Sequence, residues 1–321
     1  MNGHTTTTKS PTRVPSAGVW APAVTFFDQE TDSLDLDAQA KYYSYLSKHL
    51  TGLVILGTNA ETFLLTRSER AALLKCAREA VGPDYEVMAG VGGHSTKQVL
   101  EFIGDAVEAG ADSVLVLPCA YFGAQTSREV VMGFYGEVAE KSPLPVVVYN
   151  FPGVCNGVDI DSDMLITLHK KHSNIVGVKL TCASVGKITR LAAEFTPQEF
   201  AVYGGQSDFL IAGLAVGSAG TISGFGNVAP KTIRKIYDLY TSGQHAEALK
   251  LHRVAAHAEV IGKSGIANTK FAASLTSAKS AGIEGAEAKL APRRPYAALT
   301  DEQKKGVRGR IEETVKIERA L

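Results

Sequence analysis

The chain has 321 residues, of which 45% are hydrophobic and 21% charged, and its 33 basic side chains equal its 33 acidic ones. This balance gives no overall field for nucleic acid or an anionic membrane, and no apolar run approaches the roughly 20 residues of a membrane span. The four cysteines lack CxxC spacing, which suits a reducing compartment better than a disulfide framework.

The first segment, residues 1–16, is polar, rich in threonine and interrupted by two prolines. It lacks the apolar core of a secretory signal, so we expect a disordered tail on a cytoplasmic protein. A short mitochondrial leader is the alternative, because the segment carries basic residues and no acidic one.

From residue 18 onward, short apolar runs alternate with longer amphipathic ones. The apolar runs are rich in β-branched residues without strict alternation, which indicates strands buried on both faces of a parallel sheet. We expect eight such strands, at residues 18–27, 52–57, 86–92, 112–118, 144–150, 174–180, 199–205 and 219–224.

Amphipathic segments follow each of these runs, and in one of them Thr66 and Glu69 have the spacing of a capping box. Eight strand–helix pairs in strict order predict an α/β fold, a closed (β/α)₈ TIM barrel over residues 17–242. An open doubly wound sheet is the competing fold, but the even spacing favours closure. The expected helices lie at residues 36–50, 66–81, 95–109, 126–141, 161–171, 184–195, 206–217 and 230–240.

No strand pattern returns after the barrel. Residues 243–321 contain three helical segments and are predicted to form a C-terminal helical extension rather than a second catalytic domain. The stretch GKSG at residues 262–265 resembles part of a phosphate loop, but His257 stands where that pattern requires glycine. We therefore assign this stretch no site.

Barrel enzymes carry their reactive groups at the C-terminal ends of the strands. One such end stands out, because the buried run NIVGVKL closes on a lysine that has no acidic residue beside it in sequence. The side chain either snorkels to solvent or is a reactive amine in a pocket. The candidates from this rule are Thr58, Asn59, Tyr121, Tyr149, Asn150, Lys179, Thr181 and Ser223.

Lys179 is the only lysine among these strand-end residues, which favours the reactive amine. A neutral amine adds to a ketone to form a carbinolamine and then an iminium, and burial in apolar surroundings favours the neutral form. The iminium accepts electrons from the bond beyond the α-carbon, so that a C–C bond breaks or forms.

This chemistry also needs a proton carrier and a group that holds a carboxylate. Tyr149, one strand away, is a phenol suited to moving protons, although a wall tyrosine bonded to backbone is an equal alternative. The hydroxyl of Thr58 would relay the proton, and the backbone N–H groups of Thr58 and Asn59 would hold the carboxylate of an α-keto acid.

The stretches GTNAETFLLTRSER, YNFPG, GVKLT and GTISG together resemble the dihydrodipicolinate synthase/N-acetylneuraminate lyase family of class I aldolases. The resemblance implies a barrel with three trailing helices, pyruvate bound as a Schiff base on Lys179, and Tyr149 as proton shuttle. It also implies a homotetramer, a dimer of dimers, in which Tyr121 reaches into a neighbouring subunit's site. The substrate-binding residues expected from the strand ends and the resemblance are Thr58, Asn59, Tyr121, Thr181, Ile222 and Ser223.

Two residues differ from those of the synthases in this family, and both differences bear on the identity of the substrate. The synthases of this family carry an arginine where Val154 stands, and Asn59 resembles the branch of 4-hydroxy-2-oxoglutarate and 2-keto-3-deoxy sugar acid aldolases. We therefore expect an aldolase that releases pyruvate and an aldehyde, with a synthase and an inactive ligand-binding barrel as alternatives. We expect no cofactor and no metal, since His169 and His172 have no evident third ligand.

Overall fold

The computed structural model describes residues 13–321, and its strands form one closed barrel in which each pairs in parallel with its neighbours in sequence. This confirms the predicted (β/α)₈ fold. All strand residues are buried, as their β-branched composition indicated. The strands are β1 Gly18–Pro22, β2 Gly52–Ile55, β3 Glu86–Gly90, β4 Ser113–Val116, β5 Val146–Asn150, β6 Ile175–Leu180, β7 Ala201–Gly204 and β8 Gly220–Ile222.

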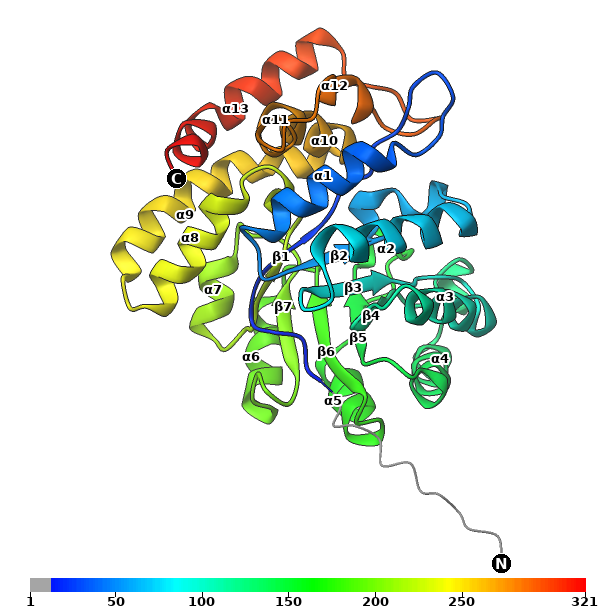
Figure 1. Cartoon of the computed structure of the whole chain (residues 1–321). Coiled ribbons are helices and arrows are strands. Elements are labelled where there is room, and N and C mark those ends of the chain that lie inside the picture. Colours follow the sequence, from blue (N-terminus) through cyan, green and yellow to red (C-terminus); the bar gives the residue numbers. More distant parts are fainter. Residues whose placement is uncertain (1–12) are drawn as a thin grey trace, which may run out of the picture.

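Eight helices follow the strands in turn and surround them as a ring (Figure 1). Each lies within or close to its predicted range. Among residues 13–321, no helix is both long and apolar enough to cross a membrane. The helices of the ring are α1 Leu36–Ser47, α2 Arg67–Val81, α3 Thr96–Glu108, α4 Arg128–Lys141, α5 Ser162–Lys171, α6 Val185–Glu194, α7 Leu210–Ala215 and α8 Pro230–Thr241.

Local sequence signals fix where α2 begins. Thr66 accepts a hydrogen bond from the backbone N–H of Glu69, and the Glu69 side chain accepts one from the backbone N–H of Thr66. This reciprocal arrangement satisfies two N–H groups that the helix itself leaves free. The predicted capping box is therefore confirmed.

The first strand is shorter than predicted, because it ends at Pro22 rather than at residue 27. Proline has no N–H to donate to a strand ladder. Beyond it, the backbone N–H of Val24 donates to Asn227 Oδ1 at 3.1 Å, and that of Phe26 donates to Gln39 Oε1 at 3.0 Å. Ala23 still donates its N–H to the Val54 carbonyl at 3.0 Å, and after it the chain leaves the sheet, where these side chains help to hold it.

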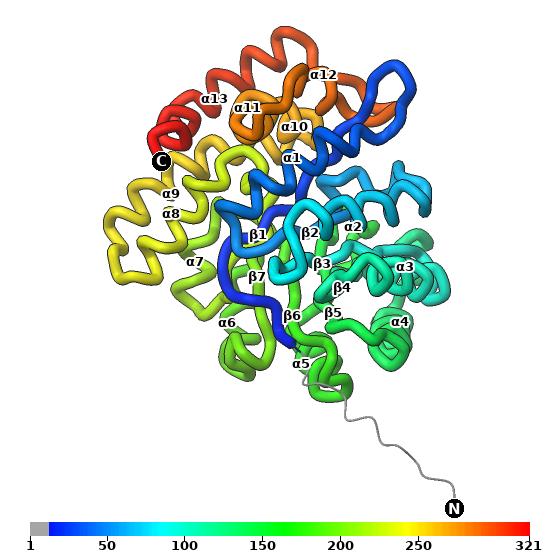
Figure 2. Tube along the Cα trace, viewed as in Figure 1, coloured from blue at the N-terminus to red at the C-terminus, as the bar shows by residue number. Residues whose placement is uncertain are grey.

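Residues 13–16 correct the expected tail, whose first twelve residues lie outside the described part of the chain. Figure 2 shows this segment crossing one end of the barrel before β1. Arg13 pairs with Glu86 at the start of β3, and the Ser16 N–H donates to the same carboxylate at 3.0 Å. On the far side, the Tyr203 hydroxyl donates to Pro15 O at 2.8 Å. These contacts, which the local sequence does not reveal, hold the segment across the N-terminal end.

The C-terminal extension contains the three expected helices and two short ones that the sequence did not indicate. α9 packs on α8, and α13 packs on α9 and α10, so the extension gathers against one side of the barrel (Figure 1). Its elements are α9 His245–Glu259, α10 Ile266–Leu275, α11 Ser277–Ser280, α12 Ala286–Lys289 and α13 Asp301–Ala320.

Two apolar layers hold this arrangement together. A larger one lies between the outer face of the strands and the surrounding helices. A smaller one fills the inside of the barrel and includes Trp20, Met88, Val147 and Ile222, all essentially without exposed surface. These side chains fill the barrel interior, as is typical of this fold, and a cavity lies at the C-terminal end of the strands.

Candidate active site

Lys179 lies on β6 and is 1% exposed. Tyr149 of β5 and Tyr203 of β7 flank it in the strand register, and its Nζ lies 4.2 Å from the centre of the Tyr149 ring. The other two buried lysines, Lys187 and Lys270, each pair with a carboxylate, whereas no ion pair involves Lys179 within residues 13–321. An amine buried without a counter-ion is costly, which indicates a chemical role.

The amine opens into a cavity of about 430 Å³ at the C-terminal end of the barrel. The predicted residues Thr58, Asn59, Tyr149, Lys179 and Thr181 all line it. The remaining lining residues are Phe151, Val154, Gly205, Gln206, Gly224, Phe225, Glu259, Gly262, Lys263, Gly265, Ile266 and Thr269.

The loop after β2 brings a hydroxyl to the phenol. Thr58 Oγ1 lies 3.4 Å from Tyr149 Oη. This is longer than a typical hydroxyl–hydroxyl hydrogen bond, and such catalytic contacts often tighten only around the substrate. Thr58 and Asn59 begin a short 3₁₀ helix, Thr58–Ala60, and the first N–H groups of a helix have no partner inside it.

The sixth and seventh strands supply a second polar feature. The Thr181 hydroxyl is buried, and among residues 13–321 it has no hydrogen-bond partner. Gly205 lies beside it, where a Cβ atom would stand 2.0 Å from Thr181 Oγ1. Only glycine therefore leaves this hydroxyl its place on the cavity wall, where a bound oxygen atom would satisfy it.

The C-terminal extension fixes the loop that carries Thr58. Glu61, directly after the 3₁₀ helix, has a left-handed backbone with φ of 57°, which is unfavourable for a side chain with a Cβ. Its carboxylate accepts hydrogen bonds from Lys270 Nζ at 2.6 Å and from the Arg293 backbone N–H at 2.8 Å. Both donors belong to the C-terminal extension, and both bonds are at least partly shielded from solvent. The extension therefore holds the loop that carries Thr58.

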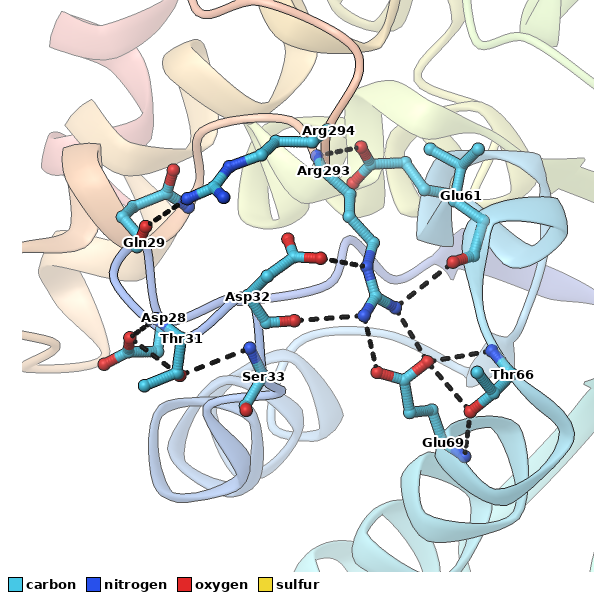
Figure 3. Close-up of polar contacts among 11 residues, drawn as sticks. Asp28, Gln29, Thr31, Asp32, Ser33, Glu61, Thr66, Glu69, Arg293 and Arg294 are labelled. Atoms are coloured by element: carbon cyan, nitrogen blue, oxygen red, sulfur yellow. Dashed lines mark hydrogen bonds and ion pairs between the residues drawn. The ribbon is translucent and has the colours of Figure 1, made fainter.

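The bonds from Lys270 and Arg293 to Glu61 form a clamp between the extension and the loop after β2, and the Arg293 side chain adds further bonds to it (Figure 3). Its guanidinium makes two 2.7 Å bonds to Glu69 and donates to the Asp32 backbone carbonyl at 3.0 Å. The guanidinium also holds the pKa of Glu69 below its usual value. The neighbouring Arg294 makes one bond, to the Gln29 carbonyl, on the exposed surface.

We expect Arg293→Gln to lower the free energy of unfolding by about 1–3 kcal/mol, because charge-assisted hydrogen bonds are lost. The loss should begin to shrink as pH falls below about 4.3, the pKa of an unperturbed glutamate, because the unfolded chain then takes up a proton at Glu69. It should vanish once the pH is below the lowered pKa that Glu69 has in the folded protein. Denaturant unfolding at pH 7 and pH 4 measures both effects. Arg294→Gln is the matched control, and an equal loss in both variants would contradict the clamp.

Sequence reasoning missed the wall that the extension supplies. Glu259, the last residue of α9, lines the cavity and is 6% exposed. Burial raises its pKa to about 7. Lys263, in the rejected GKSG stretch, also lines the cavity and donates to Asp208 Oδ2 at 2.6 Å. In the sequence these two residues are only an acidic and a basic side chain in a helical region after the barrel. That pattern does not indicate that they lie at the cavity.

Three of the six predicted substrate-binding residues do not line the cavity of this chain, and neither does the strand-end candidate Asn150, whose side chain donates to Asp159 Oδ1 at 2.7 Å. Ile222 is fully buried in the barrel interior. Ser223 lies behind Glu259, to which its hydroxyl donates at 3.0 Å. Tyr121 is 69% exposed and packs against the rings of His94 and Phe122. Direct substrate binding by these three residues stays a prediction that the lining of the cavity does not support.

Comparison with known proteins adds to this geometry. A sequence model of the dihydrodipicolinate synthetase family matches residues 15–314. A Coccidioides immitis protein, provisionally named as a mitochondrial 4-hydroxy-2-oxoglutarate aldolase, is 62% identical over 310 residues, which cover 96% of this chain and 99% of the relative. The L-threo-3-deoxy-hexylosonate aldolase of Hypocrea jecorina is 36% identical over 317 residues, with coverage of 95% and 98%.

A solved structure agrees with these relatives. YagE of E. coli K12, a protein of the dihydrodipicolinic acid synthase family in complex with pyruvate, has a TM-score of 0.83 at 26% sequence identity. The alignment covers 93% of this chain and 98% of YagE.

Proposed function

The chain belongs to the dihydrodipicolinate synthetase family, and from this premise we propose that it is a lyase, a class I aldolase. Its substrate is a 4-hydroxy-2-keto acid or a 2-keto-3-deoxy acid, which it cleaves reversibly to pyruvate and an aldehyde. The observation that carries the proposal is the buried Lys179 amine, without an ion-pair partner in residues 13–321, beside Tyr149 in the cavity.

In the proposed reaction, Lys179 Nζ attacks the C2 ketone and, after loss of water, forms an iminium. The C3–C4 bond then breaks as the C4 hydroxyl gives up its proton, and the bonding electrons move through C3 toward the iminium nitrogen. The aldehyde leaves, and the enamine takes a proton at C3. Hydrolysis of the resulting iminium releases pyruvate and restores the amine.

Tyr149 is the proposed carrier of the C4 hydroxyl proton, because its phenol is adjacent to the amine. Thr58, 3.4 Å from that phenol, relays the proton onward. The substrate carboxylate is held by the N–H groups of Thr58 and Asn59. The Thr181 hydroxyl, which has no hydrogen-bond partner in the described part of the chain, supplies a further hydrogen bond. Together these groups hold the keto acid with its C2 atom facing Lys179.

The synthase alternative has less support. Val154 lines the cavity as an apolar side chain at the position where synthases of the family carry an arginine. Condensation with a carboxylate-bearing semialdehyde would lack that cation. The inactive-barrel alternative is disfavoured because Lys179, Tyr149 and Thr58 are retained in contact range.

We expect the purified protein to release pyruvate from 4-hydroxy-2-oxoglutarate or a 2-keto-3-deoxy sugar acid in an assay coupled to lactate dehydrogenase. 2-Oxoglutarate is the matched control, since it lacks the C4 hydroxyl on which the cleavage depends. Condensation of pyruvate with aspartate semialdehyde, without cleavage of any hydroxylated acid, would favour the synthase instead.

We also propose assembly as a homotetramer, a dimer of dimers. Support comes from an exposed aromatic group at the rim of the barrel, in which Phe63, Tyr121 and Phe122 are 53%, 69% and 70% exposed. Phe63 stacks on His94, and edge-to-face contacts of Tyr121 with His94 and with Phe122 join these rings into one patch. A second copy of the chain would bury it.

For the compartment, the name of the C. immitis relative favours the mitochondrion over the cytoplasm. The basic, acid-free character of residues 1–16 is compatible with this proposal.

A further inference from the structure

One wall of the cavity takes no part in the proposed Schiff-base chemistry. It is formed by Gln206 from the loop after β7 and by Glu259 and Lys263 from the C-terminal extension. These are polar side chains on a surface that the 2-keto acid group, held at Thr58 and Lys179, does not need. The remaining part of the substrate, the aldehyde half, is the group left to face them.

Glu259 is held in one orientation by two barrel loops. Its Oε1 accepts hydrogen bonds from the Ser207 N–H at 2.9 Å and the Ser223 hydroxyl at 3.0 Å, and its Oε2 accepts one from the Ser207 hydroxyl at 2.6 Å. Ser207 is fixed in turn, since its carbonyl lies 2.7 Å from His252 Nε2. A carboxylate has about four acceptor positions, so capacity remains for one partner from the cavity.

The charges around this carboxyl suit a hydroxyl partner better than a second carboxylate. Glu259 forms no ion pair within residues 13–321, because the nearby Lys263 bonds to Asp208 instead. With a pKa raised to about 7 by burial, the carboxyl both accepts and donates hydrogen bonds near neutral pH. A hydroxyl group complements either form, whereas a substrate carboxylate is repelled by the ionised one.

We propose that Glu259, positioned by Ser207 and Ser223, binds a hydroxyl group of the aldehyde half of the substrate and so selects hydroxylated, uncharged aldehydes over carboxylated ones. This inference rests on the proposed aldolase function and deepens it. It places the substrate among the 2-keto-3-deoxy sugar acids, the class to which the name of the H. jecorina relative refers.

The test measures condensation of pyruvate with three aldehydes: glyceraldehyde, propanal, which lacks the hydroxyls, and glyoxylate, which carries a carboxylate. The wild-type protein should show its highest kcat/KM with glyceraldehyde. Glu259→Leu should lower kcat/KM for glyceraldehyde by about 10- to 100-fold, as expected when one hydrogen bond to a charged group is lost, and for propanal by less than about threefold. Glu259→Gln should retain more of the glyceraldehyde activity, because an amide still bonds to Ser207 and to a hydroxyl.

Two controls distinguish failure of this inference about Glu259 from failure of the proposed aldolase function. Glu247→Gln changes an exposed residue in the first turn of the same helix and should leave all three values unchanged. Borohydride trapping of pyruvate on Lys179 reports on the proposed function alone and should persist in every variant. If trapping persists but Glu259→Leu lowers all three values equally, or the wild type prefers glyoxylate, the inference is overturned. Without trapping in the wild type, the proposed function itself fails.

Discussion

Lys179→Ala is expected to reduce pyruvate release by about 10³-fold or more, because at least 4 kcal/mol of barrier lowering depends on the covalent intermediate. The substitution removes the nucleophile while leaving Tyr149 and Thr58 in place. The same variant should form no borohydride-stable adduct with pyruvate. Steady-state kinetics and intact mass measurement together check both results.

Folding of this variant needs its own control, since the alanine leaves a space in a buried position. Lys179→Met fills most of that space without an amine, and it should be as inactive as Lys179→Ala while unfolding at or above the wild-type temperature. Lys263→Ala removes the other lysine of the cavity and should still form the adduct. Substantial turnover in either Lys179 variant would refute the Schiff-base assignment.

Tyr149→Phe is expected to lower kcat by about 10²- to 10⁴-fold, the range for loss of a general acid–base group. The ring stays in place, so the contact between Lys179 and the aromatic face is kept and only the hydroxyl is lost. Adduct formation should therefore slow rather than disappear. Stopped-time trapping with borohydride measures that rate independently of turnover.

Tyr203→Phe is the matched control for this prediction. Tyr203 flanks Lys179 on the other side in the strand register, but its hydroxyl bonds to the Pro15 carbonyl and does not line the cavity. Its loss should cost about 1 kcal/mol of stability and leave turnover near the wild-type value. Equal losses of turnover in the two variants would show that Tyr149 acts through packing.

The sequence predicts the barrel well because its signals are local and repeated. A parallel strand buried on both faces leaves a continuous apolar run, and the capping box at Thr66 marks a helix start directly. The sequence predicts the ends of an element less accurately where contacts with distant residues determine them. β1 ends early at Pro22, and Ser16 is held by Glu86, seventy residues away. The two four-residue helices of the extension are too short to show a helical period.

The site residues also divide into those that local sequence position reveals and those that depend on distant contacts. Lys179, Tyr149 and Thr58 were found because strand ends in a barrel meet at one face, so position in the sequence gives position in space. Glu259 and Lys263 come from helices that follow the barrel, and only the packing of the extension brings them to the cavity. Ser223 illustrates the opposite case, since it lies at a strand end yet reaches the cavity only through Glu259.

The central claim is that Lys179 forms a Schiff base with pyruvate, and mass mapping after borohydride reduction tests it most directly. The wild-type protein, incubated with pyruvate and reduced, should carry one adduct, on the peptide that contains Lys179. An unmodified Lys179 peptide, or an adduct on Lys263 instead, would contradict the account.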